Sequence, residues 1–69
     1  MMEYPEPLHI DVGCKVIRRK YATKAEADKC AEVAAEEMQV QLAQGYDFGY
    51  CWPGDITEND DGTYTVVCP

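Results

Sequence analysis

The chain has 69 residues, of which 46% are hydrophobic, and a formal net charge of −7. A chain this short is expected to form one domain, 1–69, with a small core and no room for a deep catalytic cleft. It contains no apolar run of about 18 residues, and residues 1–7 lack the basic and apolar regions of a secretory signal. These features argue against a membrane protein and indicate a cytoplasmic location.

The charge is divided unevenly along the chain. Residues 1–29 contain all six lysines and arginines and only five acids, whereas residues 30–69 contain eight acids and no lysine or arginine. The negative electrostatic field of residues 30–69 repels nucleic acid and attracts a basic partner, and salt screens this attraction. We therefore expect a basic protein as the partner and no direct contact with nucleic acid.

The N-terminal part of the chain predicts one strand. Residues 1–7 contain two prolines and no periodicity, which is typical of an extended lead-in. Apolar and polar residues alternate over 8–20, and this alternation predicts a strand with one buried face. That face would carry Leu8, Ile10, Val12, Cys14 and Val16. The basic cluster at 18–20 is interpreted as a solvated strand end, because it is short and lies in an acidic molecule.

Residues 23–44 predict an amphipathic helix. Thr23 is a favourable N-cap, Glu26 completes a capping box, and Gly45 suits the position just after the helix. Apolar residues then recur at steps of three and four and gather on one face. That face carries Ala27, Cys30, Ala31, Ala34, Met38 and Leu42.

The C-terminal part predicts two further strands. Aromatic residues alternate with small or polar ones from residue 46, so 46–58 is expected to be a strand that Pro53 and Gly54 bend. The Asp61-Gly62 pair predicts a hairpin turn before a last strand over 63–68. The expected fold is therefore α+β, with one helix packed on a three-stranded, largely antiparallel sheet in the order strand-helix-strand-strand.

The residues that usually carry chemistry do not form a recognisable site. The four cysteines are widely spaced and lack the paired pattern of a zinc site, and Cys14 and Cys30 fall at apolar positions, so core thiols are expected. There is no serine, one histidine, no phosphate-binding loop, and no calcium-loop spacing in the acidic turn. We expect no catalytic residue, no metal and no cofactor.

The aromatic residues and the acids each admit two interpretations. Tyr46, Phe48, Tyr50 and Trp52 would either pack against the helix, which we expect for most of them, or form a recognition patch, with Trp52 partly exposed. The acids would either keep the protein soluble or mimic the phosphates of a nucleic acid in the groove of a basic protein. The candidate partner-binding residues are Glu32, Glu36, Glu37, Asp47, Asp55, Glu58, Asp60 and Asp61.

The closing segment Pro-Gly-Asp-Ile-Thr-Glu-Asn-Asp-Asp-Gly-Thr-Tyr-Thr-Val-Val-Cys-Pro completes a short acidic chain of strand, helix and hairpin. In size, charge and element order the whole chain resembles small proteins of bacteriophages and mobile elements, in particular the anti-CRISPR proteins. This resemblance implies a non-enzymatic inhibitor that binds a CRISPR effector complex and blocks the surface that receives target DNA. It points to a type I surveillance complex as the target, with type I-C as the expected subtype.

Two other functions compete with this hypothesis. One is a small phage structural or regulatory protein that associates through an aromatic sheet surface, and the other is a metal- or redox-linked module that uses the four cysteines. Within the favoured hypothesis we expect a monomer rather than a homodimer.

Overall fold

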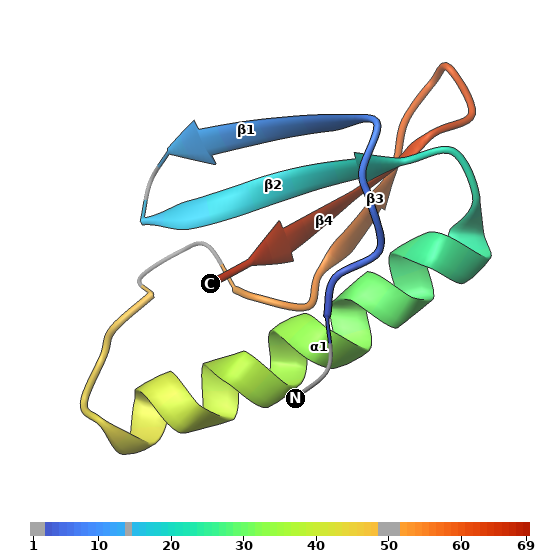
Figure 1. The fold of residues 1–69 in the computed structure, drawn as a ribbon. Coiled ribbons are helices and arrows are strands. Elements are labelled where there is room, and N and C mark those ends of the chain that lie inside the picture. The colour runs from blue at the N-terminus through green and yellow to red at the C-terminus, as the bar shows by residue number, and fades with distance from the viewer. Residues whose placement is uncertain (1–2, 14, 49–51) are drawn as a thin grey trace.

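The computed structural model describes residues 3–13, 15–48 and 52–69. Its elements are β1 (His9–Gly13), β2 (Val16–Tyr21), α1 (Lys24–Ala43), β3 (Ile56–Glu58) and β4 (Tyr64–Cys68). The strands form one antiparallel sheet in the order β1-β2-β4-β3, with α1 across one face (Figure 1). The predicted α+β class is confirmed, but the described residues form a sheet of four strands and not three.

The extra strand arises because the predicted strand 8–20 folds back on itself. β1 and β2 pair as a hairpin in which Gly13 lies opposite Val16, and Lys15 in the loop has a φ of 67°. Positive φ is what a two-residue hairpin loop requires. The apolar alternation continues across this turn, so periodicity alone could not reveal it. Cys14, which was expected on the buried face, lies outside the described residues.

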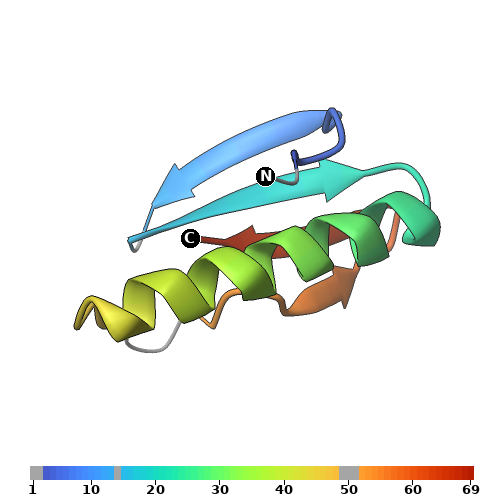
Figure 2. The same cartoon turned by 60° about the horizontal axis from the view of Figure 1, so that its bottom comes forward.

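The hairpin also changes which residues are buried. Val16 is buried as predicted, whereas Leu8, Ile10 and Val12 are exposed. The reason is that α1 packs on β2, β3 and β4 and does not reach β1 (Figure 2). The predicted buried face is therefore wrong for all of β1.

The predicted helix is confirmed, with Thr23 as its N-cap and Gly45 just after its end as expected, but the Glu26 carboxylate accepts from the Thr23 hydroxyl where a capping box would use the Thr23 N–H. The Thr23 hydroxyl accepts a hydrogen bond from the Glu26 N–H at 3.3 Å and donates one to the Glu26 carboxylate at 2.9 Å. At the other end Gly45 has a φ of +87°, and its N–H donates to the Leu42 carbonyl at 3.0 Å. These contacts satisfy backbone groups that a helix leaves without partners at its ends.

The core lies between α1 and the central strands. Its main cluster joins three small helix residues to β2 and β4, and consists of Tyr21, Ala27, Cys30, Ala34, Val66 and Cys68. A second cluster near the C-terminal half of α1 consists of Val16, Met38 and Phe48, with Val67 packed against it. The alanine-rich face predicted for the helix is thus the face that packs on the sheet, although Leu42 at its end is exposed.

The predicted strand 46–58 is wrong over most of its described residues: of 46–48 and 52–58, only Ile56–Glu58 is a strand, and 49–51 lie outside the described residues. The Tyr46 N–H donates to the Gln41 carbonyl, so the residues after α1 continue its cap and do not begin a strand. Gly54, with a φ of +97°, donates to the Val67 carbonyl at 2.8 Å and brings the chain back to β4. The predicted turn before β4 is confirmed, with Gly62 at a φ of +85°.

The aromatic residues divide between core and surface. Phe48 is buried and contacts the Tyr46 ring, with 4.7 Å between ring centroids, but Tyr46 itself is exposed. The core prediction is therefore wrong for Tyr46. Trp52 is exposed, as expected, and Tyr50 lies outside the described residues. Within the described part of the chain, no helix is long and apolar enough to cross a membrane.

Candidate functional site

Two exposed acids, Glu32 and Glu36, lie four residues apart on α1 and are here called the acidic row. Residues four apart share one face of a helix, and the rise of 1.5 Å per residue separates them by about 6 Å along the axis. One DNA strand carries a charge for about every 3.4 Å of axis, so the row has roughly half that density. It can attract a basic groove, but with less force than the nucleic acid that it would replace.

Neighbouring residues limit the size of this row. Asp28, one turn before Glu32, is exposed, but its carboxylate is 3.2 Å from the Lys24 ammonium. Glu37 is half-buried on another side of the helix, near Tyr4. The pKa of Tyr4 is raised mainly by burial and secondly by the Glu37 carboxylate. Glu37 therefore faces the N-terminal segment, and the helix contributes two of its three predicted site residues to one exposed surface.

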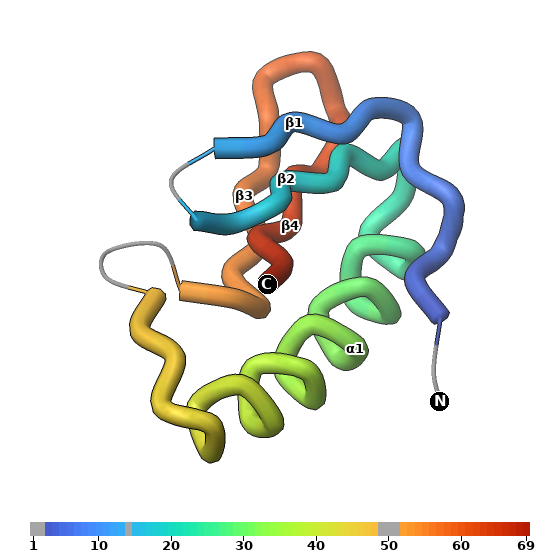
Figure 3. Tube along the Cα trace, turned by 60° about the vertical axis from the view of Figure 1, so that its left-hand side comes forward, coloured from blue at the N-terminus to red at the C-terminus, as the bar shows by residue number. Residues whose placement is uncertain are grey.

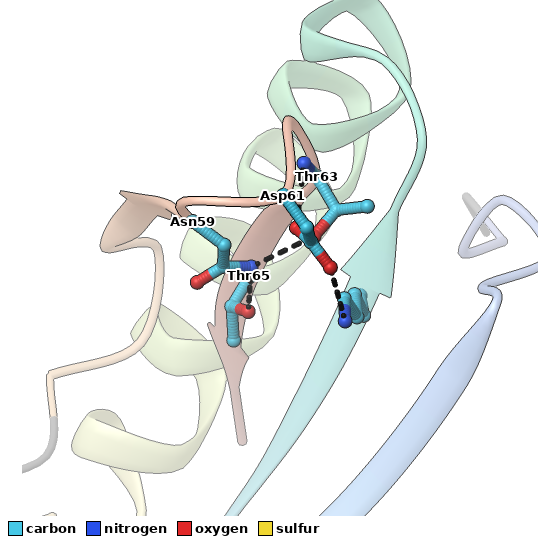
Figure 4. Close-up of polar contacts among 5 residues, drawn as sticks. Asn59, Asp61, Thr63 and Thr65 are labelled. Atoms are coloured by element: carbon cyan, nitrogen blue, oxygen red, sulfur yellow. Dashed lines mark hydrogen bonds and ion pairs between the residues drawn. The ribbon is translucent and has the colours of Figure 1, made fainter.

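The acids of the last turn serve the hairpin itself (Figure 4). Asp61 accepts hydrogen bonds from the Thr63 backbone and hydroxyl, and it forms an ion pair with Lys20 at 3.0 Å. These contacts lower the pKa of Asp61 to about 2. The hydrogen bond from the Thr63 hydroxyl has the largest effect, and the contact with Lys20 the next largest. Asn59 closes the turn by donating to the hydroxyls of Thr63 and Thr65 at 3.1 and 2.9 Å. Asp61 is thus a structural acid, although sequence alone places it in the binding set.

The structure does not bring the eight predicted acids onto one surface. The turn 59–63 lies at the side of the sheet away from α1, so Asp60 and Asp61 are remote from the acidic row (Figure 1, Figure 3). Glu58 accepts a hydrogen bond from the Tyr64 hydroxyl at 3.4 Å, and Lys24 lines the same shallow pocket. Asp47 follows the helix and Asp55 precedes β3, and both are exposed.

The basic residues of the first half are largely engaged within the fold. Lys20 pairs with Asp61, and Lys24 with Asp28. Arg19 lies opposite Ile10 and Val66 in the sheet, and residues opposite one another share a face, so it points to the side that α1 covers. Its guanidinium carbon is 3.9 Å from the centroid of the Tyr4 ring. The prediction of a solvated strand end is therefore wrong for Arg19.

Two cysteines meet beside Arg19 in the main core. The sulfur atoms of Cys30 on α1 and Cys68 on β4 are 3.5 Å apart, and both thiols are free and buried. A hydrogen bond from Cys68, aided by Tyr21 and the charge of Arg19, lowers the pKa of Cys30 to about 7. The same contact and burial raise the pKa of Cys68. The pair can therefore share one negative charge next to a cation.

Sequence reasoning placed Cys30 in the core but missed this cluster. Cys30 and Cys68 are 38 residues apart in the chain, and no local pattern signals their contact. One buried guanidinium nitrogen of Arg19 lacks a hydrogen-bond partner in the described structure, so neighbouring groups such as the thiol pair must offset the charge of this side chain. Among the described residues no group of three or more metal-ligating side chains is present.

Comparison with known proteins adds no relative: no family model matches the chain, and neither the curated proteins nor the solved structures contain a significant match. The function must therefore be inferred from the charge and geometry of this chain.

Proposed function

We propose that this protein is a non-enzymatic inhibitor that binds a bacterial CRISPR effector complex and keeps target DNA from binding. The acidic row on α1 would contact the basic surface of the effector that otherwise binds the phosphate backbone of target DNA. The observation that carries this proposal is that residues 30–69 have no lysine or arginine, while Glu32 and Glu36 stand exposed on a capped helix. Within the described part of this chain Glu32 and Glu36 form no ion pair, so their carboxylates can bind the cations of a partner.

The arrangement of the basic residues supports the same proposal. Lys20, Lys24 and Arg19 contact groups of the same chain, so their charges are partly offset within the fold. The excess negative charge is left at the surface, where it can steer the protein toward a basic partner. Lys29, next to the acidic row and exposed, reduces this field locally.

The particular target rests on the resemblance of the sequence to anti-CRISPR proteins. A type I surveillance complex is the first candidate, with type I-C as the subtype, and its place of action would be the bacterial cytoplasm. The competing function, association through an aromatic sheet surface, has less support. Tyr46 and Trp52 are exposed but lie outside the strands.

The proposal is tested by affinity purification with the tagged protein from a bacterium that carries type I systems, followed by mass spectrometry of the bound proteins. Wild type should recover effector subunits that no longer bind target DNA. The variant Glu32→Lys with Glu36→Lys should recover them at least tenfold less well, because it reverses the charge of the acidic row.

The matched control is Glu3→Lys with Glu6→Lys, which changes the net charge equally at exposed acids outside the helix and outside the candidate set. It should keep most of the recovery. Equal loss in both variants would mean that net charge alone governs binding. Undiminished recovery with the helix variant would contradict a role for the acidic row.

A further inference from the structure

An apolar edge of the sheet remains uncovered in the described structure. Leu8, Ile10 and Val12 are 64%, 49% and 74% exposed, although all three belong to or adjoin a strand. Ile10 lies opposite Arg19, and Val12 opposite Ile17, so their side chains are on the same face as α1. Because α1 reaches only as far as β2, this apolar strip has no cover among the described residues.

β1 has a single acid, Asp11, to protect its free edge. Such edges are usually short, charged, bulged or interrupted by proline. β3, the opposite edge, follows this rule with three residues that end in Glu58. β1 has five residues, no proline and no lysine or arginine, and the views in Figure 1 and Figure 2 show no described segment beyond it. Its free edge is therefore open to another strand.

The hairpin geometry fixes which backbone groups β1 offers. Residues that flank a two-residue loop form a hydrogen-bonded pair, and bonded and non-bonded pairs then alternate along the ladder. Gly13 and Val16 flank the loop, so His9, Asp11 and Gly13 direct their backbone groups toward β2. Ile10 and Val12 consequently direct theirs outward, where a further strand can use them.

We propose that a second copy of this chain occupies this edge, with the two β1 strands antiparallel about a two-fold axis at Ile10. This register places Ile10 opposite Ile10 and brings Val12 of each copy next to the start of its partner's β1, which Leu8 precedes, so the exposed apolar residues of both copies come close together. On the other face it places His9 of each copy opposite Asp11 of its partner. The strand is thus complementary to itself both in its apolar residues and in its polar pairs.

Charge selects this register over the nearest alternative. An axis at Asp11 would also bring outward-facing backbone groups together, with Ile10 opposite Val12. It would set the two Asp11 carboxylates directly opposite one another, and like charges in that position are unfavourable. The axis at Ile10 avoids this repulsion and gains two pairings between an imidazole and a carboxylate.

The expected dimer is a continuous eight-stranded sheet with both helices on the same side. The contact involves one short strand from each copy, so it is smaller than the interfaces of permanent dimers, and protein concentration should control it. This proposal does not depend on the proposed function. It replaces the monomer that sequence alone favoured.

Sedimentation velocity over about a hundredfold range of concentration tests the dimer directly. Wild type should shift from monomer to dimer, and Ile10→Lys should weaken the association about tenfold or more, because two lysines would meet at the axis. The matched control is Val40→Lys, which places the same charge at a helix residue that is 59% exposed. It should dimerise like wild type. A wild type that stays monomeric throughout, or equal effects of both substitutions, would overturn the proposal.

A charge swap tests the register. His9→Asp should weaken the dimer by about twofold to thirtyfold, because it sets two acids opposite one another at two places. Adding Asp11→Lys to that variant should restore the dimer, since each introduced carboxylate then faces the introduced ammonium of the other copy. With the axis at Asp11, like charges would face one another in both variants, Asp11 against Asp11 in the single and lysine against lysine in the double, so the double variant would not restore the dimer. That result, or a single variant without effect, would contradict the Ile10 register.

Discussion

At the scale of single residues, the most informative feature is the contact of two buried thiols with one cation. A charged arginine on the covered face of a sheet is costly unless a nearby group offsets its charge. Cys30 and Cys68 lie where they can do so, with 3.5 Å between their sulfur atoms, and the pKa of Cys30 is lowered as a result. The cluster thus links the helix, the last strand and Arg19 through electrostatics as well as packing.

The lowered pKa of Cys30 makes stability depend on pH. Between about 7 and its usual 9.0 this thiol is deprotonated in the folded chain and protonated in the unfolded one. The unfolded state binds more protons there, so the free energy of unfolding should rise with pH, by on the order of 2 kcal/mol. Cys68, Tyr4 and Tyr21 have raised pKa values, and their contribution should be lost as pH increases further.

Urea denaturation at a series of pH values measures this effect. Cys30→Ala should abolish the rise, because it removes the group that titrates, and alanine suits a face that already contains Ala27 and Ala34. Glu26→Gln alters an acid at the helix start and should keep the rise. A flat profile for wild type, or an unchanged rise in Cys30→Ala, would show that Cys30 is not the titrating group.

At the scale of elements, the cap of α1 gives the most local prediction. Thr23→Ala removes the hydroxyl that accepts from the Glu26 N–H, and it should lower the free energy of unfolding by about 1 kcal/mol. Thr23→Ser keeps an equivalent oxygen and should remain within a few tenths of wild type. Thermal or urea unfolding followed by circular dichroism compares the three proteins. Equal losses in both variants would point to the lost methyl group and not to the cap.

The elements also show what sequence can and cannot predict here. The helix was predictable because Thr23, Glu26 and Gly45 mark its ends and its apolar residues keep one period. The strands at 8–20 and 46–58 were not, because alternation continues through the turn between Gly13 and Val16 and because the residues after α1 cap the helix. A strand pattern reports which residues can be extended, whereas the choice of partner strand depends on distant parts of the chain.

The candidate site divides in the same way. Charge composition predicted that acids of residues 30–69 would be exposed, and Glu32 and Glu36 are. It could not show that Asp61 is bound by Lys20 or that Glu37 faces Tyr4, since both contacts join residues far apart in the chain. The open edge of β1 was hidden for the same reason, because its apolar residues carry the pattern of a buried face.

At the scale of the whole molecule, the fold separates its charges and leaves two unlike surfaces. The acidic row stands on the helix, and the apolar strip of Leu8, Ile10 and Val12 lies at the edge of the sheet that α1 does not reach. If the two β1 strands pair, both helices come to one side of the extended sheet, and two acidic rows face the same way. Such a dimer would present twice the charge to a basic partner. The proposed inhibition itself requires only one copy.

The most direct test of the central claim is a competition measurement with a purified type I effector and fluorescently labelled target DNA. Increasing amounts of the protein should lower DNA binding until the effector is saturated, and added salt should weaken this inhibition because it screens the carboxylates. Glu32→Lys with Glu36→Lys should need at least tenfold more protein for the same effect. Full DNA binding in the presence of excess wild-type protein, or inhibition equal to wild type by the charge-reversed variant, would contradict inhibition through the acidic row.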